Sequence, residues 1–176
     1  MLSSLRKLFG TGPDPRDARR PLWNAVVETA RAPHWYSDGK VPDTLDGRFD
    51  MISLVLALVL HRIDDDPEQT LAGVQLTELF VDDMDGQMRQ IGFGDMVVGK
   101  QIGRMVGALG GRLGVYRAPD GSDELKAALV RNLWRGKDAP DPGLDHVMAE
   151  VAKLRAALSA TPVEALIIAD RLPVQD

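Results

Sequence analysis

The run FDMISLVLALVLH at residues 49–61 decides the fold of this chain of 176 residues. It is apolar on nearly every side of a helical wheel, which indicates a helix buried at the centre of the protein. Its β-branched residues would also allow a strand, but its length and its Leu, Ala and Met content favour a helix. It ends at His61 and Arg62, well short of the roughly 20 apolar residues that a membrane-spanning helix needs.

The segments on either side of this run carry apolar residues at helical spacing, and none alternates as a strand would. We therefore predict an all-α fold, a single irregular domain of about six to seven helices around the central one. The further helices are expected near residues 21–31, 67–90, 96–116, 123–134, 144–158 and 163–168. The expected division is an N-terminal amphipathic segment and linker (1–18), a helical core (19–136) and a C-terminal helical extension packed on the core (137–176).

Composition excludes several classes of function. The chain has no cysteine, so disulfides, thiol catalysis and thiolate metal sites are absent, as suits a reducing cytoplasm. Its net charge of −5 argues against a general nucleic-acid-binding protein, which usually carries a basic excess. With 44% hydrophobic residues it can bury a substantial core.

Residues 82–116, DDMDGQMRQIGFGDMVVGKQIGRMVGALGGRLGVY, predict two helices joined at a glycine turn. Gly92 suits the end of the first helix and Asp95 the N-cap of the second. The second helix has one apolar face, made of Ile102, Met105, Val106, Leu109, Leu113 and Tyr116. Beside this face lie a basic face (Lys100, Arg104, Arg112) and a stripe of glycines at every fourth position (Gly99, Gly103, Gly107, Gly111).

The glycine stripe is costly, because each interior glycine destabilises a helix by about 0.5–1 kcal/mol relative to alanine. The cost is explained if another helix approaches closely along the stripe, as faces of small residues allow. A close contact within the same chain is the favoured explanation. A groove for a helix of another protein is the alternative.

Two further features allow either a structural or a binding role. Trp35 and Tyr36 lie in a segment rich in Gly and Pro, where aromatic residues either fill the core or contact a partner. The N-terminus predicts a short basic amphipathic helix that either contacts a membrane surface weakly or is a frayed end or packing arm. Its candidate membrane contacts are Leu2, Leu5, Arg6, Lys7, Leu8 and Phe9.

The sequence offers little support for catalysis. Residues 94–100 match the phosphate-binding pattern G-x-x-x-x-G-K, but Gln101 stands where that loop needs Ser or Thr, and a helix precedes it. The acidic groups Asp64–Asp66 and Asp82, Asp83 and Asp85 are expected to be solvated helix ends and faces. His34, His61 and His146 are far apart in sequence and are expected to be packed or surface residues. We therefore expect no catalytic residue, no cofactor and no metal site.

Four segments resemble one family. They are APHWYSDGKVPDTLDGRFDMI (32–52), LTELFVDDMDGQMRQIGFGDMVVGKQIGRM (76–105), GRLGVYRA (111–118) and LVRNLW (129–134). Together they are similar to the ubiquinol–cytochrome c chaperone family, in its alphaproteobacterial branch. The similarity covers roughly residues 20–136.

This resemblance implies an all-helical, non-enzymatic chaperone that binds cytochrome b, or another complex III subunit, during assembly of ubiquinol–cytochrome c reductase. It implies a location in the cytoplasm, at the inner face of the cytoplasmic membrane, and by analogy a small partner protein or the ribosome. The predicted partner-binding residues are Trp35, Tyr36, Phe93, Met96, Gly99, Gly103, Met105, Gly107 and Leu113. Two alternatives stay open: a helical metal-dependent enzyme using Asp82, Asp83 and Asp85, and a structural adaptor without an apolar client.

Overall fold

The structure is a computed structural model that describes residues 14–90, 92, 94–137 and 139–173. All regular structure in these residues is helical, which confirms the predicted all-α fold. The α-helices are α2 (Arg20–Ala30), α3 (His34–Ser37), α4 (Leu45–Asp64), α5 (Thr70–Gln90), α6 (Asp95–Val115), α7 (Asp123–Leu133), α8 (Asp141–Ala160) and α9 (Val163–Leu166). Two 3₁₀ turns, η2 (Pro15–Arg19) and η3 (Pro67–Gln69), precede α2 and α5.

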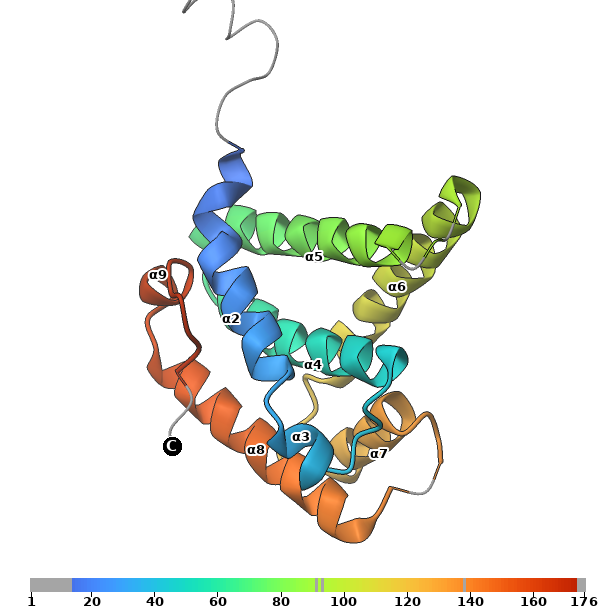
Figure 1. The fold of residues 1–176 in the computed structure, drawn as a ribbon. Helices are drawn as coiled ribbons and strands as arrows, with labels where there is room; N and C mark the ends of the chain where they lie inside the picture. The colour runs from blue at the N-terminus through green and yellow to red at the C-terminus, as the bar shows by residue number, and fades with distance from the viewer. Residues whose placement is uncertain (1–13, 91, 93, 138, 174–176) are drawn as a thin grey trace, which may run out of the picture.

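Helix α4 is the centre of the fold, as its apolar sequence predicts. Residues 50–60 are all buried, and α2, α5, α6, α7 and α8 pack around the helix (Figure 1). Thr44 caps its start, because the Thr44 side chain accepts a hydrogen bond of 3.1 Å from the Gly47 N–H. A Cβ at Gly47 would lie 1.9 Å from the Pro42 carbonyl oxygen. Only glycine therefore fits where the chain turns into α4.

Helices α5 and α6 are joined by the predicted glycine turn. Gly92 has φ = 93°, a left-handed conformation that glycine adopts at no steric cost, and its N–H donates to the Arg89 carbonyl at 3.0 Å. The predicted N-cap is wrong by one residue, because Gly94 caps the helix and Asp95 is its first residue. From this turn α6 runs back at an angle to α5, past α4 and toward α7 (Figure 1).

Two segments expected to be irregular contain helical turns. Residues 15–19, predicted as linker, form η2, which packs on α5. There Arg16 pairs with Asp82 at 2.6 Å. The segment after α2, also expected to be irregular, contains the short helix α3. Helix α8 packs along α4 and α7. The division of the chain at residues 18 and 136 stays a prediction.

Within the part of the chain that is described, every helix is too short or too polar to cross a bilayer. This includes α4, which is the most apolar of the long helices but carries Asp50 near its start and His61 and Arg62 near its end. The burial of α4 inside the protein explains its hydrophobicity without a membrane.

Candidate functional site

The glycine stripe of α6 faces open space. Gly99, Gly103, Gly107 and Gly111 are all exposed. A Cβ built at any of them would meet no heavy atom of the described residues within 4 Å, outside the helix's own backbone. The favoured explanation, a close contact within the chain, is therefore wrong. The described residues leave this face of α6 uncovered, and the alternative explanation, contact with another protein, stays a prediction.

The opposite side of α6 packs on the core. Tyr116, which follows the helix, and Leu109 are buried, and Ile102, Met105 and Leu113 are partly buried against the core. Val106, predicted to share this face, is 40% exposed instead, so the apolar face is narrower than its sequence suggests. The structure thus gives α6 one packed side and one bare side.

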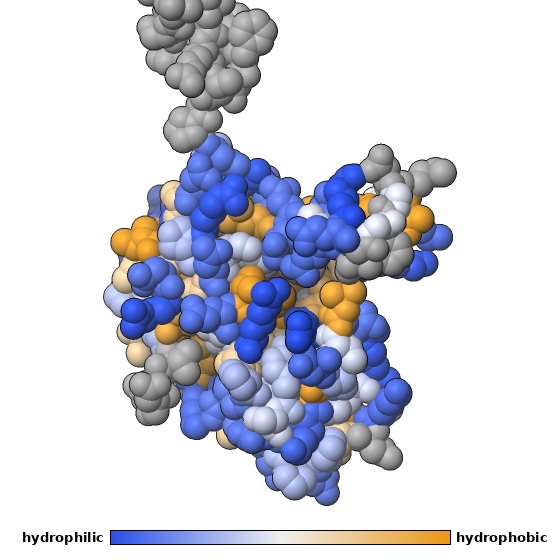
Figure 2. All heavy atoms as spheres, viewed as in Figure 1, coloured by the Kyte–Doolittle hydropathy of each residue, from blue (hydrophilic) through white to orange (hydrophobic). Residues whose placement is uncertain are grey.

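A groove lies beside Met105, where α4, α5 and α6 approach each other. Its centre is a mainly apolar cavity of about 90 Å³, whose lining includes Phe49, Met84, Met88 and Met105 and, at its edge, Arg31, Asp46, Arg48 and Gln87. A larger recess of about 360 Å³ adjoins it and shares Phe49, Met88 and Met105 with it. We call these two connected spaces the methionine groove. Figure 2 shows the surface hollowed between the α5–α6 arm and the body below it, with hydrophobic residues inside the hollow.

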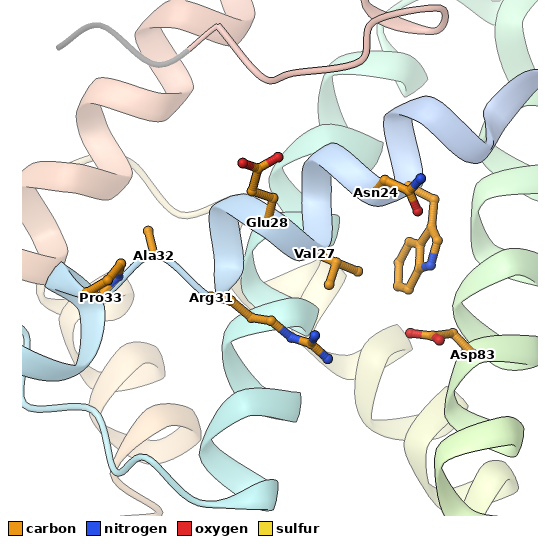
Figure 3. Close-up of a pocket in the computed structure, with 8 residues that line it drawn as sticks. Asn24, Val27, Glu28, Arg31, Ala32, Pro33 and Asp83 are labelled. Atoms are coloured by element: carbon orange, nitrogen blue, oxygen red, sulfur yellow. The ribbon is translucent and has the colours of Figure 1, made fainter.

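A third space continues the groove around α2. It measures about 660 Å³ and shares Arg31 with the apolar cavity. Trp23 and Val27 of α2 form part of its wall, and Arg31 and Asp83 point toward one another across it from α2 and α5 (Figure 3). The depressions on this side of the molecule therefore form a series that runs from α2 to α7.

A buried carboxylate forms two ion pairs with arginines at the end of the groove near α7. Asp50 of α4 is fully buried and pairs with Arg112 of α6 at 2.5 Å and with Arg135, which follows α7, at 3.2 Å. Burial raises the pKa of the Asp50 carboxyl, and the two guanidinium groups oppose this shift. Arg112 also lies over the Phe49 ring, with its guanidinium carbon 5.1 Å from the ring centroid.

The Asp50 network corrects the predicted basic face of α6. Arg112 was grouped with Lys100 and Arg104, but its side chain is 11% exposed and is held by Asp50. Sequence reasoning did not identify Asp50 as functional or structural. The available signal was its position, since it is the one charged residue within an otherwise apolar run at residues 49–60. Such a residue requires a buried partner of opposite charge.

Trp35 and Tyr36 serve as packing residues in this fold. The Trp35 indole N–H donates to the Thr29 carbonyl at 2.8 Å, and the Tyr36 hydroxyl donates to the Ala30 carbonyl at 2.9 Å. Trp35 is 2% exposed. Both side chains thus join α3 to the end of α2, in agreement with the core-filling alternative. Their predicted contact with a partner is not tested by this arrangement.

Only some of the other predicted contact residues are described by the structure. Leu2, Leu5, Arg6, Lys7, Leu8 and Phe9 lie outside the described residues, as do Phe93 and the side chain of Met96. Leu113 lies away from the methionine groove, in a depression of about 330 Å³ between α4, α5 and α6 that also contains Leu60 and Gly73. Of the predicted set, Met105 is the residue that lines the methionine groove.

The acidic residues of α5 do not converge. Asp82 pairs with Arg16, Asp83 accepts a hydrogen bond of 3.0 Å from Gln87, and Asp85 pairs with Arg89 at 2.6 Å. No group of three or more His, Cys, Asp or Glu residues suited to a metal ion occurs in the described part of the chain. The predicted interpretation as helix faces therefore accounts for these carboxylates.

Two of the three histidines meet. His34 Nδ1 and His146 Nε2 are 2.9 Å apart, which joins α3 to α8. Burial is the main cause that lowers the pKa of His34. His61 donates from Nε2 to the Leu113 carbonyl at 2.8 Å, and burial lowers its pKa as well. The three side chains are packing residues, as predicted, but the His34–His146 pair was not foreseen.

Comparison with known proteins now identifies the family. The family model described as ubiquinol-cytochrome C chaperone matches residues 37–171. The chain belongs to this family. The match spans α4, α5 and α6, which form the methionine groove, and extends through α8, beyond the residues 20–136 on which the resemblance rests.

A solved structure has a fold similar to that of this chain. The chain is similar to the crystal structure of the Cbp3 homolog from Brucella abortus, with a TM-score of 0.77 and 28% sequence identity. The similarity covers 99% of this chain and 97% of that chain. A comparison with curated proteins finds no match. The family and the solved structure together confirm the predicted family resemblance.

Proposed function

We propose that this protein is a non-enzymatic assembly chaperone for ubiquinol–cytochrome c reductase and that cytochrome b is its client. Family membership supports a role in assembly of this complex. The proposed client follows from the resemblance, which implies binding of that subunit before it is fully assembled. A small partner protein or the ribosome is an additional proposed contact, by analogy only.

The methionine groove is the observation that carries this proposal. Met84, Met88 and Met105 surround an apolar cavity beside Phe49, and methionine side chains adjust to partners of different shape. A chaperone that holds segments of a membrane protein needs such an adaptable apolar surface, because its client exposes apolar helices before assembly. The groove is open to solvent along its larger recess (Figure 2).

The bare glycine stripe supports contact with a helix. At Gly99, Gly103 and Gly107 the helix presents no side chain of its own, so a partner backbone can approach closely. We propose that a client helix lies along this stripe and reaches Met105 at the edge of the groove. Phe93, Met96 and Leu113 remain proposed contacts in the same region of sequence. Trp35 and Tyr36 would have to leave the core to take part.

The proposed location is the cytoplasmic face of the membrane, where the N-terminal residues Leu2–Phe9 would provide weak affinity for the surface. A short helix with Leu and Phe on one side and Arg and Lys on the other has this chemistry. Flotation of the full chain with vesicles measures the affinity. Equal flotation after removal of residues 2–9 would overturn the proposed membrane contact.

Copurification from native membranes tests the client. Wild-type protein should retain cytochrome b. Gly103→Leu should keep its thermal stability, because the added side chain meets no described atom of the protein. It should lose the client, because the same side chain occupies the space proposed for the client helix. Met105→Glu should weaken retention as well. Gly86→Leu is the matched control, since Gly86 of α5 also has no described atom within 4 Å of a built Cβ and lies away from the groove.

Two results would overturn this proposal. One is the absence of cytochrome b from wild-type eluates, together with normal levels of the assembled complex in a deletion strain. The other is equal retention of cytochrome b by wild type, Gly103→Leu and Met105→Glu.

A further inference from the structure

The larger recess of the methionine groove is strongly basic. It lies between α4, α6 and α7, has a volume of about 360 Å³, and is lined by both acidic and basic side chains. Its four arginines are Arg104, Arg112, Arg131 and Arg135. Two carboxylates pair with arginines of the recess. They are Asp46, at the edge of the recess, and the buried Asp50.

These charges do not balance. Asp50 pairs with Arg112 and Arg135, and Asp46 pairs with Arg135 at 3.1 Å. Arg104 donates to the neutral Gln101 side chain at 3.2 Å. Neither Arg104 nor Arg131 has an ion pair with any residue that the structure describes. The recess therefore has two more positive than negative side chains.

A buried donor at the wall of the same recess also lacks an acceptor. Arg112 Nη1 is inaccessible to solvent and has no hydrogen-bond partner among the described residues, whereas the buried amide of Asn132 lies beside the Tyr116 hydroxyl. A buried donor left unpaired destabilises a protein by about 1–3 kcal/mol. An acceptor in the recess removes this cost once the Arg112 guanidinium turns to meet it. A negatively charged acceptor also neutralises the excess charge of the arginines.

A single water molecule does not fulfil both requirements. Water occupies about 30 Å³, far less than this recess of about 360 Å³, and it carries no charge. Phosphate and carboxylate groups supply several acceptor oxygens and match the planar fork of arginine. The apolar residues Phe49, Met88 and Met105 border the recess and continue into the smaller cavity, so the space next to the arginines suits an apolar group.

We propose that this recess binds an oxyanion, a phosphate or carboxylate group, that is attached to an apolar body. The oxyanion lies between Arg104 and Arg131, and the apolar body lies on Met88 and Met105. The site requires no client protein, so it can be tested with the isolated full chain. Its failure would leave the proposed binding of cytochrome b untouched.

Calorimetric titration of the full chain with two probes tests the site. The probes are inorganic phosphate and dodecyl phosphate below its micelle concentration, at matched ionic strength. Dodecyl phosphate should bind at least about tenfold more tightly, because only it contacts the methionines. Absence of binding by both probes at millimolar concentration would overturn the site, and equal affinity for the two probes would overturn the apolar body.

Substitution of exposed arginines locates the binding. Arg131→Gln and Arg104→Gln should each weaken dodecyl phosphate binding by about tenfold, since each removes a charge-assisted hydrogen bond. Lys126→Gln is the matched control, because Lys126 is an exposed cation on α7 outside the recess. A loss with Lys126→Gln as large as that with Arg131→Gln would overturn the site, since it would show general attraction of anions.

Vesicles distinguish the two sources of such a ligand. If anionic phospholipid vesicles bind wild type and bind Arg131→Gln about tenfold less, a lipid headgroup is the source. If only monomeric dodecyl phosphate depends on Arg131, the source is a soluble amphiphile. Either result supports the oxyanion site, and vesicle and monomer binding that are both independent of Arg131 would overturn it.

Discussion

Asp50 of α4 and Arg112 of α6 form a buried ion pair with an oxygen–nitrogen distance of 2.5 Å. It connects the central helix to the helix that carries the glycine stripe, and its arginine lines the basic recess. Buried pairs of this kind are strongly coupled, because loss of one partner leaves an uncompensated charge in a medium of low dielectric constant.

Asp50→Leu should therefore destabilise the protein by about 3–5 kcal/mol. The double variant Asp50→Leu with Arg112→Met should recover much of this loss, because it leaves no buried charge at either position. Urea unfolding of wild type, Asp50→Leu, Arg112→Met and the double variant measures the coupling as a double-mutant cycle. Additive effects of the two substitutions would contradict a direct ion pair.

The glycine stripe predicts a gain in stability. Gly103→Ala should stabilise the protein by about 0.5–1 kcal/mol, because alanine favours the helix and its methyl group meets open space. Gly47→Ala should instead destabilise it, since a Cβ there would lie 1.9 Å from the Pro42 carbonyl oxygen. Thermal melting of both variants makes the comparison. A lower melting temperature for Gly103→Ala would show that the stripe is covered within the protein.

Histidine burial predicts a loss of stability in mild acid. The pKa values of His34 and His61 lie below their ordinary value of 6.5 in the folded protein. As the pH falls through this value, the unfolded chain therefore binds more protons than the folded protein does. The free energy of unfolding should therefore decrease between pH 7 and pH 5.

Variants at the histidines identify the groups responsible. His34→Asn removes one partner of the 2.9 Å contact with His146 and should flatten the dependence of stability on pH. Denaturant melts at pH 7 and pH 5, for wild type and variant, provide the measurement. An unchanged slope in both His34→Asn and His61→Asn would mean that other groups cause the effect.

One substitution tests whether Trp35 acts in folding stability or in client binding. Trp35→Phe keeps an aromatic ring but removes the indole N–H, which leaves the Thr29 carbonyl without its 2.8 Å hydrogen bond. We expect a destabilisation of about 1–3 kcal/mol with no change in client retention at temperatures where the variant is folded. Loss of the client with unchanged stability would assign Trp35 to the partner surface instead.

Much of the fold follows from local sequence. The apolar run at residues 49–60 and the turn at Gly92 predicted a central helix and a helix pair, and both are present. The helix expected near residues 123–134 is also present, and the Ser122 side chain caps it by accepting from the Leu125 N–H at 3.1 Å. These features depend on contacts between residues a few positions apart, so the order of residues alone determines them.

The candidate site depends on contacts between distant residues. Asp50 and Arg112 are 62 positions apart, and His34 and His146 are 112 apart. The sequence of α6 shows a glycine stripe but does not show which neighbour covers it, so the favoured internal contact was wrong. Helical periodicity determined that α6 has distinct faces. Only the packing of α4, α5 and α7 decided which face is buried, which is bare and where the basic recess forms.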